Sequence, residues 1–383
     1  MLGLRLHVIG AGLRGQRKEC VRVSAVEGRA PGGAACLRDT ASWRGLFPSL
    51  GTLLCVDDCG TGLGVEQGIC SGAGEFCKRS WRRRLGDDME LSGCGTALVT
   101  PFSRDESVDE AALRRLVEWQ IASGIDFLVP CGTTGEASTL SEAEWLRVVE
   151  VVVETAAGRV PVFGGCTHNG TKEAVRRAKV LAEVRGLSGM LTANPYYNRP
   201  GQEGQFQHFK AIAEAVELPV LLYNIPGRTG VNLEPATVAR LAEVPNIIGV
   251  KESSGSVMQI TEVLQTAPKG FKVFAGDDGM ALPVIALGGS GLVSVASNAL
   301  PAEVSGMVRA ALAGRWAEAQ EINLRLFRLM QAHFAETSPG PIKAVLAMLG
   351  RGEEVLRLPM VPVSEGLRGR LRGMLEKVRG DTE

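Results

Sequence analysis

The chain has 383 residues, 45% of them hydrophobic, so it is long enough for one large domain or two ordinary ones. Its 42 basic side chains balance 42 acidic ones, which leaves no net attraction to nucleic acid or to an anionic membrane. No apolar run reaches the roughly 18 residues that a membrane-spanning helix needs. We expect a soluble, cytoplasmic globular protein that binds neither nucleic acid nor membrane.

Residues 1–88 differ in composition from the rest of the chain. They contain six of the nine cysteines and 16 of the 48 glycines, and they show no sustained apolar period of 3.6 or 2. Gly10, Gly12 and Gly15 match the G-x-G-x-x-G fingerprint of dinucleotide-binding folds, but no amphipathic helix follows them, as that fingerprint requires. A dinucleotide site is therefore an open but weak interpretation.

Two further interpretations of residues 1–88 are also weak, the targeting peptide less so than the metal site, and a fourth is favoured. Cys55 and Cys59 could bind a metal, but the second close pair typical of zinc sites does not follow. Residues 1–18 carry basic side chains and no acid, as a targeting peptide does, but their glycines disrupt an amphipathic helix. The favoured hypothesis is a disordered segment, or an upstream reading frame translated by mistake with the true start at Met89. The N-terminal sequence of the native protein tests it.

Residues 89–313 alternate short apolar runs with helical stretches eight times. Ser141 and Glu144 form a capping-box pattern, and Pro235 stands where the first residue of a helix favours proline. Runs that are apolar on both faces and followed by amphipathic helices predict parallel strands covered by helices. Eight such units favour a (β/α)8 TIM barrel over an open doubly wound sheet. The predicted strands are 97–102, 127–131, 160–164, 190–193, 220–225, 247–250, 273–275 and 292–296.

Residues 314–383 have the pattern of successive helices. Trp316, Ile322, Leu326 and Met330 recur at helical spacing, and such a stripe is typical of packing or of a subunit interface. We therefore expect a C-terminal helical appendage to the barrel.

Functional residues of such a barrel lie at the carboxyl ends of its strands and in the loops that follow. After the second strand comes GTTGE (132–136, the GTTGE loop), whose backbone N–H groups and hydroxyls suit a small carboxylate or phosphate, although a simple tight turn is the alternative. After the fourth comes NPYYNRP (194–200), with two of the three tyrosines. The fifth ends in YNIPGRTG (223–230), which supplies a proton-carrying tyrosine and a carboxylate-binding arginine.

Lys251 stands at the end of the sixth apolar strand. Burial of a charged lysine is costly, and the same desolvation lowers its pKa until the neutral amine can attack a carbonyl carbon. The sequence thus indicates a lysine that forms a Schiff base. The alternative is a lysine at the strand end whose ammonium group reaches solvent.

The motifs GTTGE, PYYNRP, YNIPGRTG and GVKE, in this order and spacing, resemble those of the pyruvate-dependent class I aldolases and lyases, most closely the dihydrodipicolinate synthase family. The likeness extends from about Ser92 to the C-terminal helices, whereas residues 1–88 have no counterpart. It implies a lyase that condenses pyruvate with L-aspartate 4-semialdehyde to 4-hydroxy-tetrahydrodipicolinate, a step of diaminopimelate and lysine biosynthesis. It also implies that no metal or organic cofactor takes part; the four histidines show no ligand spacing.

The resemblance implies a role for each catalytic residue. Lys251 forms the imine with pyruvate, and Tyr223 is the acid/base beside it. Thr133 links Tyr223 to Tyr197 in a proton relay. In the family the second tyrosine of PYYNRP comes from the neighbouring subunit, so Tyr197 implies a homo-oligomer that is at least a dimer. Because tetramers are common in the family, the resemblance favours a tetramer.

The resemblance also implies the substrate contacts. Thr134 and the backbone of the GTTGE loop hold the carboxylate of pyruvate, and Arg228 binds the carboxylate of L-aspartate 4-semialdehyde at the entrance. Gly276 and Val293 line the floor.

Other functions remain open within and outside the superfamily. Sialic-acid (N-acetylneuraminate) lyases and 2-keto-3-deoxy sugar-acid aldolases share the lysine and the tyrosine, but Arg228 and the double threonine favour the synthase. A non-catalytic regulatory barrel would be expected to have lost Lys251 or Tyr223, and this chain has both.

Feedback inhibition by lysine is a separate expectation. Asn169, Glu173 and Tyr196 match the allosteric pocket of the family, whereas Glu142 and Trp145 stand in two places that sensitive enzymes often fill with histidine. An indole and an added carboxylate there predict weak or absent inhibition.

Overall fold

The computed structural model describes residues 6–10, 19–23 and 91–380. Strands β1 (Leu6–Gly10) and β2 (Glu19–Val23) pair with each other in an antiparallel two-stranded sheet. Of the residues that the interpretations of 1–88 rest on, Gly10 ends β1, whereas Gly12, Gly15, Cys55, Cys59 and Met89 lie outside the described residues. The hypothesis of a disordered or mistakenly translated segment 1–88 therefore stays a prediction.

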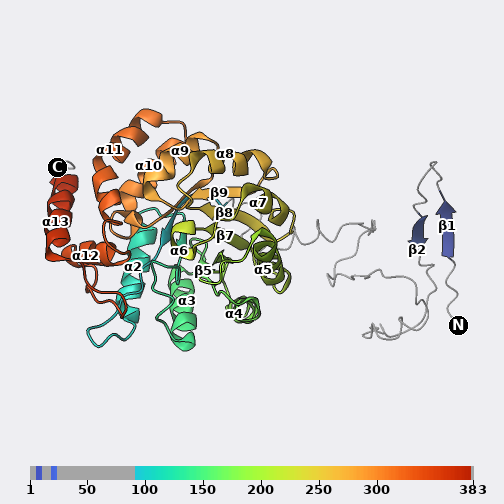
Figure 1. The fold of residues 1–383 in the computed structure, drawn as a ribbon, viewed down its shortest axis with the longest axis horizontal. Helices are drawn as coiled ribbons and strands as arrows, with labels where there is room; N and C mark the ends of the chain where they lie inside the picture. The colour runs from blue at the N-terminus through green and yellow to red at the C-terminus, as the bar shows by residue number, and fades with distance from the viewer. Residues whose placement is uncertain (1–5, 11–18, 24–90, 381–383) are drawn as a thin grey trace, which may run out of the picture. The chain divides into compact units, whose positions relative to one another are not determined.

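Eight parallel strands form a barrel in residues 91–380 (Figure 1). Neighbouring strands pair in the order β4-β3-β10-β9-β8-β7-β6-β5, and a parallel bridge between Leu128 and Val162 joins the two ends of this series. The predicted TIM barrel is confirmed. The strands are β3 (Gly93–Ala97), β4 (Phe127–Val129), β5 (Phe163–Gly165), β6 (Gly189–Ala193), β7 (Val220–Asn224), β8 (Ile247–Glu252), β9 (Lys272–Ala275) and β10 (Gly291–Ser294).

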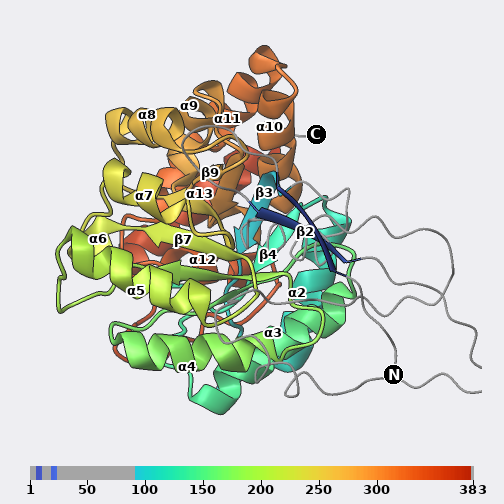
Figure 2. The same ribbon diagram turned by 90° about the vertical axis from the view of Figure 1, so that its right-hand side faces the viewer.

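Helices surround the strands, as two views at right angles show (Figures 1 and 2). Each parallel connection needs a crossover segment, and a helix provides one that covers the sheet. The helices of this layer are α2 (Glu110–Ala122), α3 (Glu142–Ala156), α4 (Thr171–Ala182), α5 (Gln202–Glu214), α6 (Pro226–Thr229), α7 (Pro235–Leu241), α8 (Val257–Thr266), α9 (Ala281–Ala286) and α10 (Pro301–Leu312), with short 3₁₀ turns η2 (Asp278–Met280) and η3 (Ala296–Asn298).

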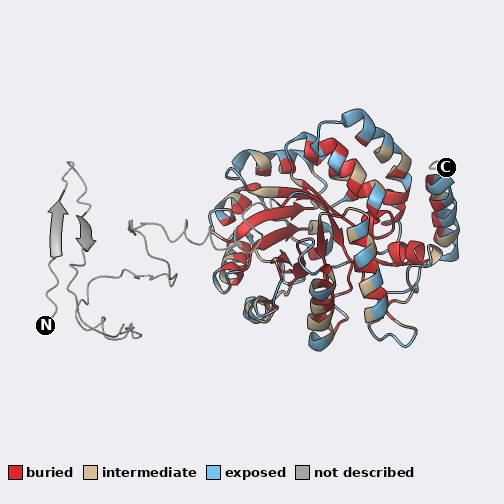
Figure 3. Cartoon of the chain, turned by 180° about the vertical axis from the view of Figure 1, so that it is seen from behind, coloured by how far each residue is buried: buried red, intermediate tan, exposed pale blue. Residues whose placement is uncertain are grey.

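Two hydrophobic clusters hold this architecture together. One lies inside the barrel, where the ring of Phe127 meets those of Phe163 and Phe274 edge to face. The larger one lies between the strands and the helices. Burial of each Leu, Val or Phe contributes about 1.5–3 kcal/mol. Figure 3 shows the result, with buried strands at the centre and exposed outer faces on the helices.

The first strand of the barrel is not where the sequence predicted it. The prediction of 97–102 is wrong, because β3 is the glycine-containing segment Gly93–Ala97. A Cβ at Gly95 would lie 2.1 Å from the ring of Phe127, so this strand has a glycine where the core leaves no room for a side chain. A segment without large apolar residues escapes a search for apolar runs. The other seven predicted strands overlap the observed ones.

The predicted helix starts are confirmed. The Ser141 hydroxyl accepts a hydrogen bond from the Glu144 N–H, and the Glu144 carboxylate accepts one from the Ser141 N–H. Pro235 begins α7. These caps satisfy N–H groups that have no partner within the helix.

Three helices follow the barrel: α11 (Trp316–Ala332), α12 (Gly340–Met348) and α13 (Glu365–Gly380). In the predicted stripe of α11, Leu326 and Met330 are buried, whereas 36% of Trp316 is exposed. The C-terminal helical appendage is therefore present. In the ranges that the structure describes, no helix is long and apolar enough to cross a membrane.

Candidate active site

Lys251 and Tyr223 lie side by side on neighbouring strands. They are partners in the parallel register of β7 and β8, and the Lys251 Nζ lies 4.2 Å from the centroid of the Tyr223 ring. Only 4% of Lys251 and 6% of Tyr223 is exposed. Because adjacent residues of a strand point to opposite faces, Glu252 points away from Lys251, and it accepts hydrogen bonds from the Asn224 amide instead.

Burial is the main influence on the Lys251 amine. Desolvation lowers its pKa to about 8, the nearby Asp278 carboxylate opposes this shift, and the Arg228 charge adds to it. The sequence analysis did not single out Asp278, a buried residue of η2 that hydrogen-bonds Ser294 and the N–H of Ala296. A useful fraction of Lys251 is therefore neutral and nucleophilic near neutral pH.

The Tyr223 phenol is kept protonated. Burial raises its pKa to about 12, while the charge of Arg228 and the hydroxyls of Ser253 and Thr133 act in the opposite direction. A protonated phenol next to a neutral amine can donate a proton to an oxygen that leaves the attacked carbon. The pair thus combines a nucleophile with a general acid.

Gly276 and Val293 lie in the barrel interior, at positions consistent with the predicted floor. A Cβ at Gly276 would lie 2.9 Å from the Lys251 Cε and 1.9 Å from the Ser253 Oγ, so only glycine leaves room there for the lysine. Val293 belongs to the inner cluster and is fully buried.

The GTTGE loop follows β4 and contains two free N–H groups. The N–H groups of Gly135 and Glu136 donate to the carbonyls of Gly132 and Thr133, at 3.1 Å each. Among the described residues, no hydrogen bond satisfies the N–H of Thr133 or of Thr134. Two adjacent free N–H groups, with a buried threonine beside them, are suited to a carboxylate.

Arg228 and Tyr197 lie outside the buried pair. Arg228 belongs to the short helix α6 and donates to the Ser338 carbonyl at 3.2 Å, and its charge acts on both Lys251 and Tyr223. Tyr197 is 87% exposed and has a φ of 73°. In a single chain, Tyr197 is therefore exposed, whereas Lys251 and Tyr223 are buried.

Arginines occupy the candidate allosteric region. The Arg176 guanidinium pairs with both Glu142 and Glu173, and the Nε of Arg177 donates to Glu173 at 3.2 Å. Trp145 is buried, with its indole N–H on the Gly165 carbonyl at 2.8 Å. The sequence analysis did not single out these arginines: their pairs with Glu173 lie within α4, and only the pair of Arg176 with Glu142 joins two helices.

Asn169 and Tyr196, the other two residues of this region, are partly accessible. The Asn169 carbonyl accepts a hydrogen bond from the Asn198 amide at 2.9 Å, and Tyr196 is 40% exposed.

The model of the dihydrodipicolinate synthetase family matches residues 90–378. The chain belongs to that family. It is 61% identical over 284 residues to 4-hydroxy-tetrahydrodipicolinate synthase of Acidobacterium capsulatum. This alignment covers 74% of the present chain and 94% of the relative. It is 59% identical over 293 residues to the enzyme of the same name from Koribacter versatilis, with 76% and 96% covered.

Solved structures agree with this membership. The chain superimposes with a TM-score of 0.74 and 40% identity on the chloride-inhibited dihydrodipicolinate synthase of Acinetobacter baumannii complexed with pyruvate. The match covers 76% of this chain and 99% of that one. The TIM barrel and the motif-bearing loops thus belong to an established family architecture.

Proposed function

We propose that this protein is a 4-hydroxy-tetrahydrodipicolinate synthase, a lyase that condenses pyruvate with L-aspartate 4-semialdehyde in diaminopimelate and lysine biosynthesis. The observation that carries the proposal is the buried amine of Lys251, whose pKa is lowered by desolvation, 4.2 Å from the ring centroid of the buried Tyr223. Membership of the family and the relatives' shared name support the same reaction.

The neutral Lys251 amine attacks the keto carbon of pyruvate, and Tyr223 donates the proton with which the carbonyl oxygen leaves as water. The resulting iminium withdraws electrons, so the methyl group loses a proton and becomes an enamine. The enamine carbon attacks the aldehyde and forms the new C–C bond. The amino group of the adduct then displaces Lys251 and closes the ring. No metal or organic cofactor is required for these steps.

The loops supply binding and proton transfer. The N–H groups of Thr133 and Thr134 receive the carboxylate of pyruvate, and Arg228 receives that of the aldehyde substrate as a bidentate partner. Thr133 connects Tyr223 to Tyr197 of a second chain. A residue that completes the site of a neighbouring chain would be exposed in the single chain, as Tyr197 is. The protein is then a homo-oligomer, at least a dimer and in our proposal a tetramer, working in the cytoplasm.

Borohydride trapping tests the proposed function. The enzyme is reduced in the presence of pyruvate, digested and mapped by mass, and pyruvate consumption is followed with aspartate semialdehyde or with sugar aldehydes. Pyruvate on Lys251 and turnover of aspartate semialdehyde alone support the synthase. Turnover of sugar aldehydes instead would move the protein to the sugar-acid lyases, and no trapping would contradict imine chemistry.

Imine formation is expected to depend on pH through Lys251. Its pKa is about 8, so below that value the neutral fraction, and with it the rate of trapping, rises about tenfold per pH unit and then levels off. Single-turnover trapping at saturating pyruvate between pH 6 and pH 9 measures the profile. A rate independent of pH over this range would mean that the amine is already neutral at pH 6.

Lysine is expected to inhibit weakly or not at all. Arg176 and Arg177 already pair with the Glu173 carboxylate, and their positive charges disfavour the ammonium groups of lysine. Steady-state rates should stay above half at submillimolar lysine. Arg176→Gln, which removes one competing charge, should increase the sensitivity. Half-inhibition of the unmodified enzyme at submillimolar lysine contradicts the expectation.

A further inference from the structure

Two residues of the C-terminal region contact the GTTGE loop or the segment that follows it. Lys343 belongs to α12, and Arg357 lies in the segment between α12 and α13. Neither takes part in the reaction proposed above. We call these two residues the C-terminal clamp, because both contact the loop or the segment directly after it.

Lys343 forms a buried ion pair with Glu136, the last residue of the GTTGE loop. Each side chain is only 2% exposed. The Lys343 Nζ also donates to the Val355 carbonyl at 2.8 Å and lies 4.2 Å from the centroid of the Phe102 ring. A buried charge is strongly unfavourable without its partner, so each side chain of this pair restrains the other.

Glu136 has a backbone conformation that needs outside support. Its φ is 52°, in the left-handed region that non-glycine residues rarely occupy. The backbone N–H of Arg357 donates to the second oxygen of the Glu136 carboxylate at 3.3 Å, and the Thr100 hydroxyl donates to the Gly135 carbonyl at 2.7 Å. Contacts to the carboxylate and to the preceding carbonyl therefore hold the end of the loop.

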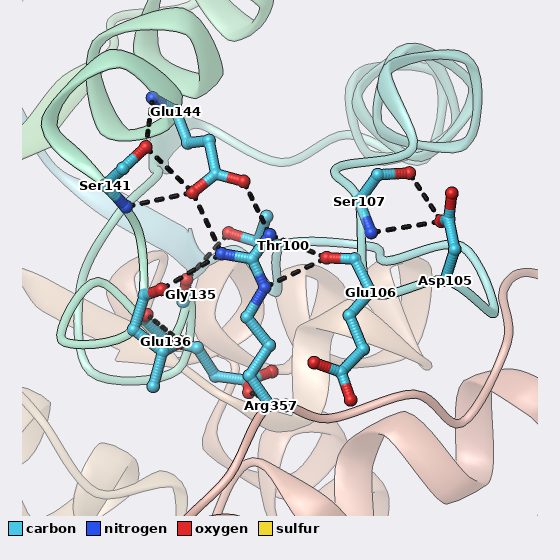
Figure 4. Close-up of polar contacts among 10 residues, drawn as sticks. Thr100, Asp105, Glu106, Ser107, Gly135, Glu136, Ser141, Glu144 and Arg357 are labelled. Carbon is cyan, nitrogen blue, oxygen red and sulfur yellow. Dashed lines mark hydrogen bonds and ion pairs between the residues drawn. The ribbon is translucent and has the colours of Figure 1, made fainter.

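Arg357 uses every N–H of its guanidinium group (Figure 4). It donates twice to the Glu106 carbonyl, once to the Thr139 carbonyl and twice to the Glu144 carboxylate, at distances between 2.5 and 2.9 Å. Its plane also lies over the Phe102 ring, 4.4 Å from the centroid. A planar group with five satisfied donors joins three segments of the barrel in one geometry.

We propose that Lys343 and Arg357 are positioning residues for pyruvate binding. Lys343 fixes Glu136 and the Arg357 guanidinium fixes Thr139, and together they keep the free N–H groups of Thr133 and Thr134 directed to the place where a carboxylate binds. This inference rests on the proposed function of the loop. Lys251 is held by β8 instead, so loss of the clamp weakens the binding of pyruvate without removing the amine chemistry.

Arg357→Met tests the clamp, with Arg147→Met as the matched control. Arg147 of α3 also makes several ion-pair contacts, including two to Glu110 at 2.8 Å, but none to the GTTGE loop. In Arg357→Met we expect a KM for pyruvate about tenfold higher, with the KM for the aldehyde within twofold. We also expect amide hydrogen exchange in residues 133–140 to be at least about tenfold faster than in the wild type. The control should match the wild type in each measurement.

Arg357→Lys keeps the positive charge but lacks the planar guanidinium group, so its pyruvate KM and its exchange rates should lie between those of the wild type and of Arg357→Met. This variant serves as the test if Arg357→Met does not fold. An unchanged pyruvate KM together with unchanged loop exchange overturns the inference, as does an equal change in Arg147→Met. The exchange measurement needs no turnover. If the wild type fails to trap pyruvate, the proposed function is wrong, and exchange alone decides whether the clamp orders the loop.

Discussion

Lys251→Met is expected to lower turnover by on the order of 10³-fold or more and to abolish trapping of pyruvate. Without the imine there is no electron sink, and the methyl group of pyruvate is too weak an acid to form the carbon nucleophile. Methionine has a similar length and removes a group whose charged form is disfavoured by burial, so the barrel should remain folded. Steady-state rates, borohydride trapping and thermal unfolding measure the three effects.

Lys269→Met is the matched control for this variant. Lys269 is an exposed lysine between α8 and β9, so its loss should leave both trapping and turnover as in the wild type. Turnover of a folded Lys251→Met enzyme at more than a few per cent of the wild-type rate is incompatible with a mechanism through this amine.

Periodicity was sufficient to predict the barrel, because buried parallel strands and covering helices impose different spacings of apolar residues. It failed at β3, where Gly95 makes room for Phe127 and leaves no apolar signal. The closeness of Lys251 and Tyr223 follows from the predicted strands, since both residues stand at carboxyl ends of neighbouring strands. Their exact pairing depends on the register of β7 and β8, which no local pattern encodes.

The supporting contacts of the site could not be predicted. The ion pair of Lys343 and Glu136 joins residues more than 200 positions apart, and Arg357 contacts segments that are equally remote in sequence. Asp278 gains its influence on Lys251 only through burial beside it. A single sequence shows which residue types are present, but such contacts depend on how elements pack in three dimensions.

Tyr223→Phe is expected to lower kcat by about 10²- to 10⁴-fold, the range typical of a lost general acid or base. The phenyl ring keeps the packing against Lys251, so the fold and the amine should persist. Incorporation of solvent deuterium into the methyl group of pyruvate should slow in parallel, since it reports enamine formation without the second substrate. A decrease of less than tenfold in both measurements would assign the proton transfer to another group.

Mixing Tyr223→Phe with Tyr197→Phe subunits tests whether the second tyrosine comes from a partner. If it does, one site of each mixed dimer receives both intact tyrosines and the other receives neither. Random exchange then makes half of the dimers mixed, and about a quarter of all sites recover full activity. If Tyr197 acts within its own chain, every site lacks one tyrosine and mixing restores nothing. The exposed position of Tyr197 in the single chain favours recovery, and the activity before and after subunit exchange measures it.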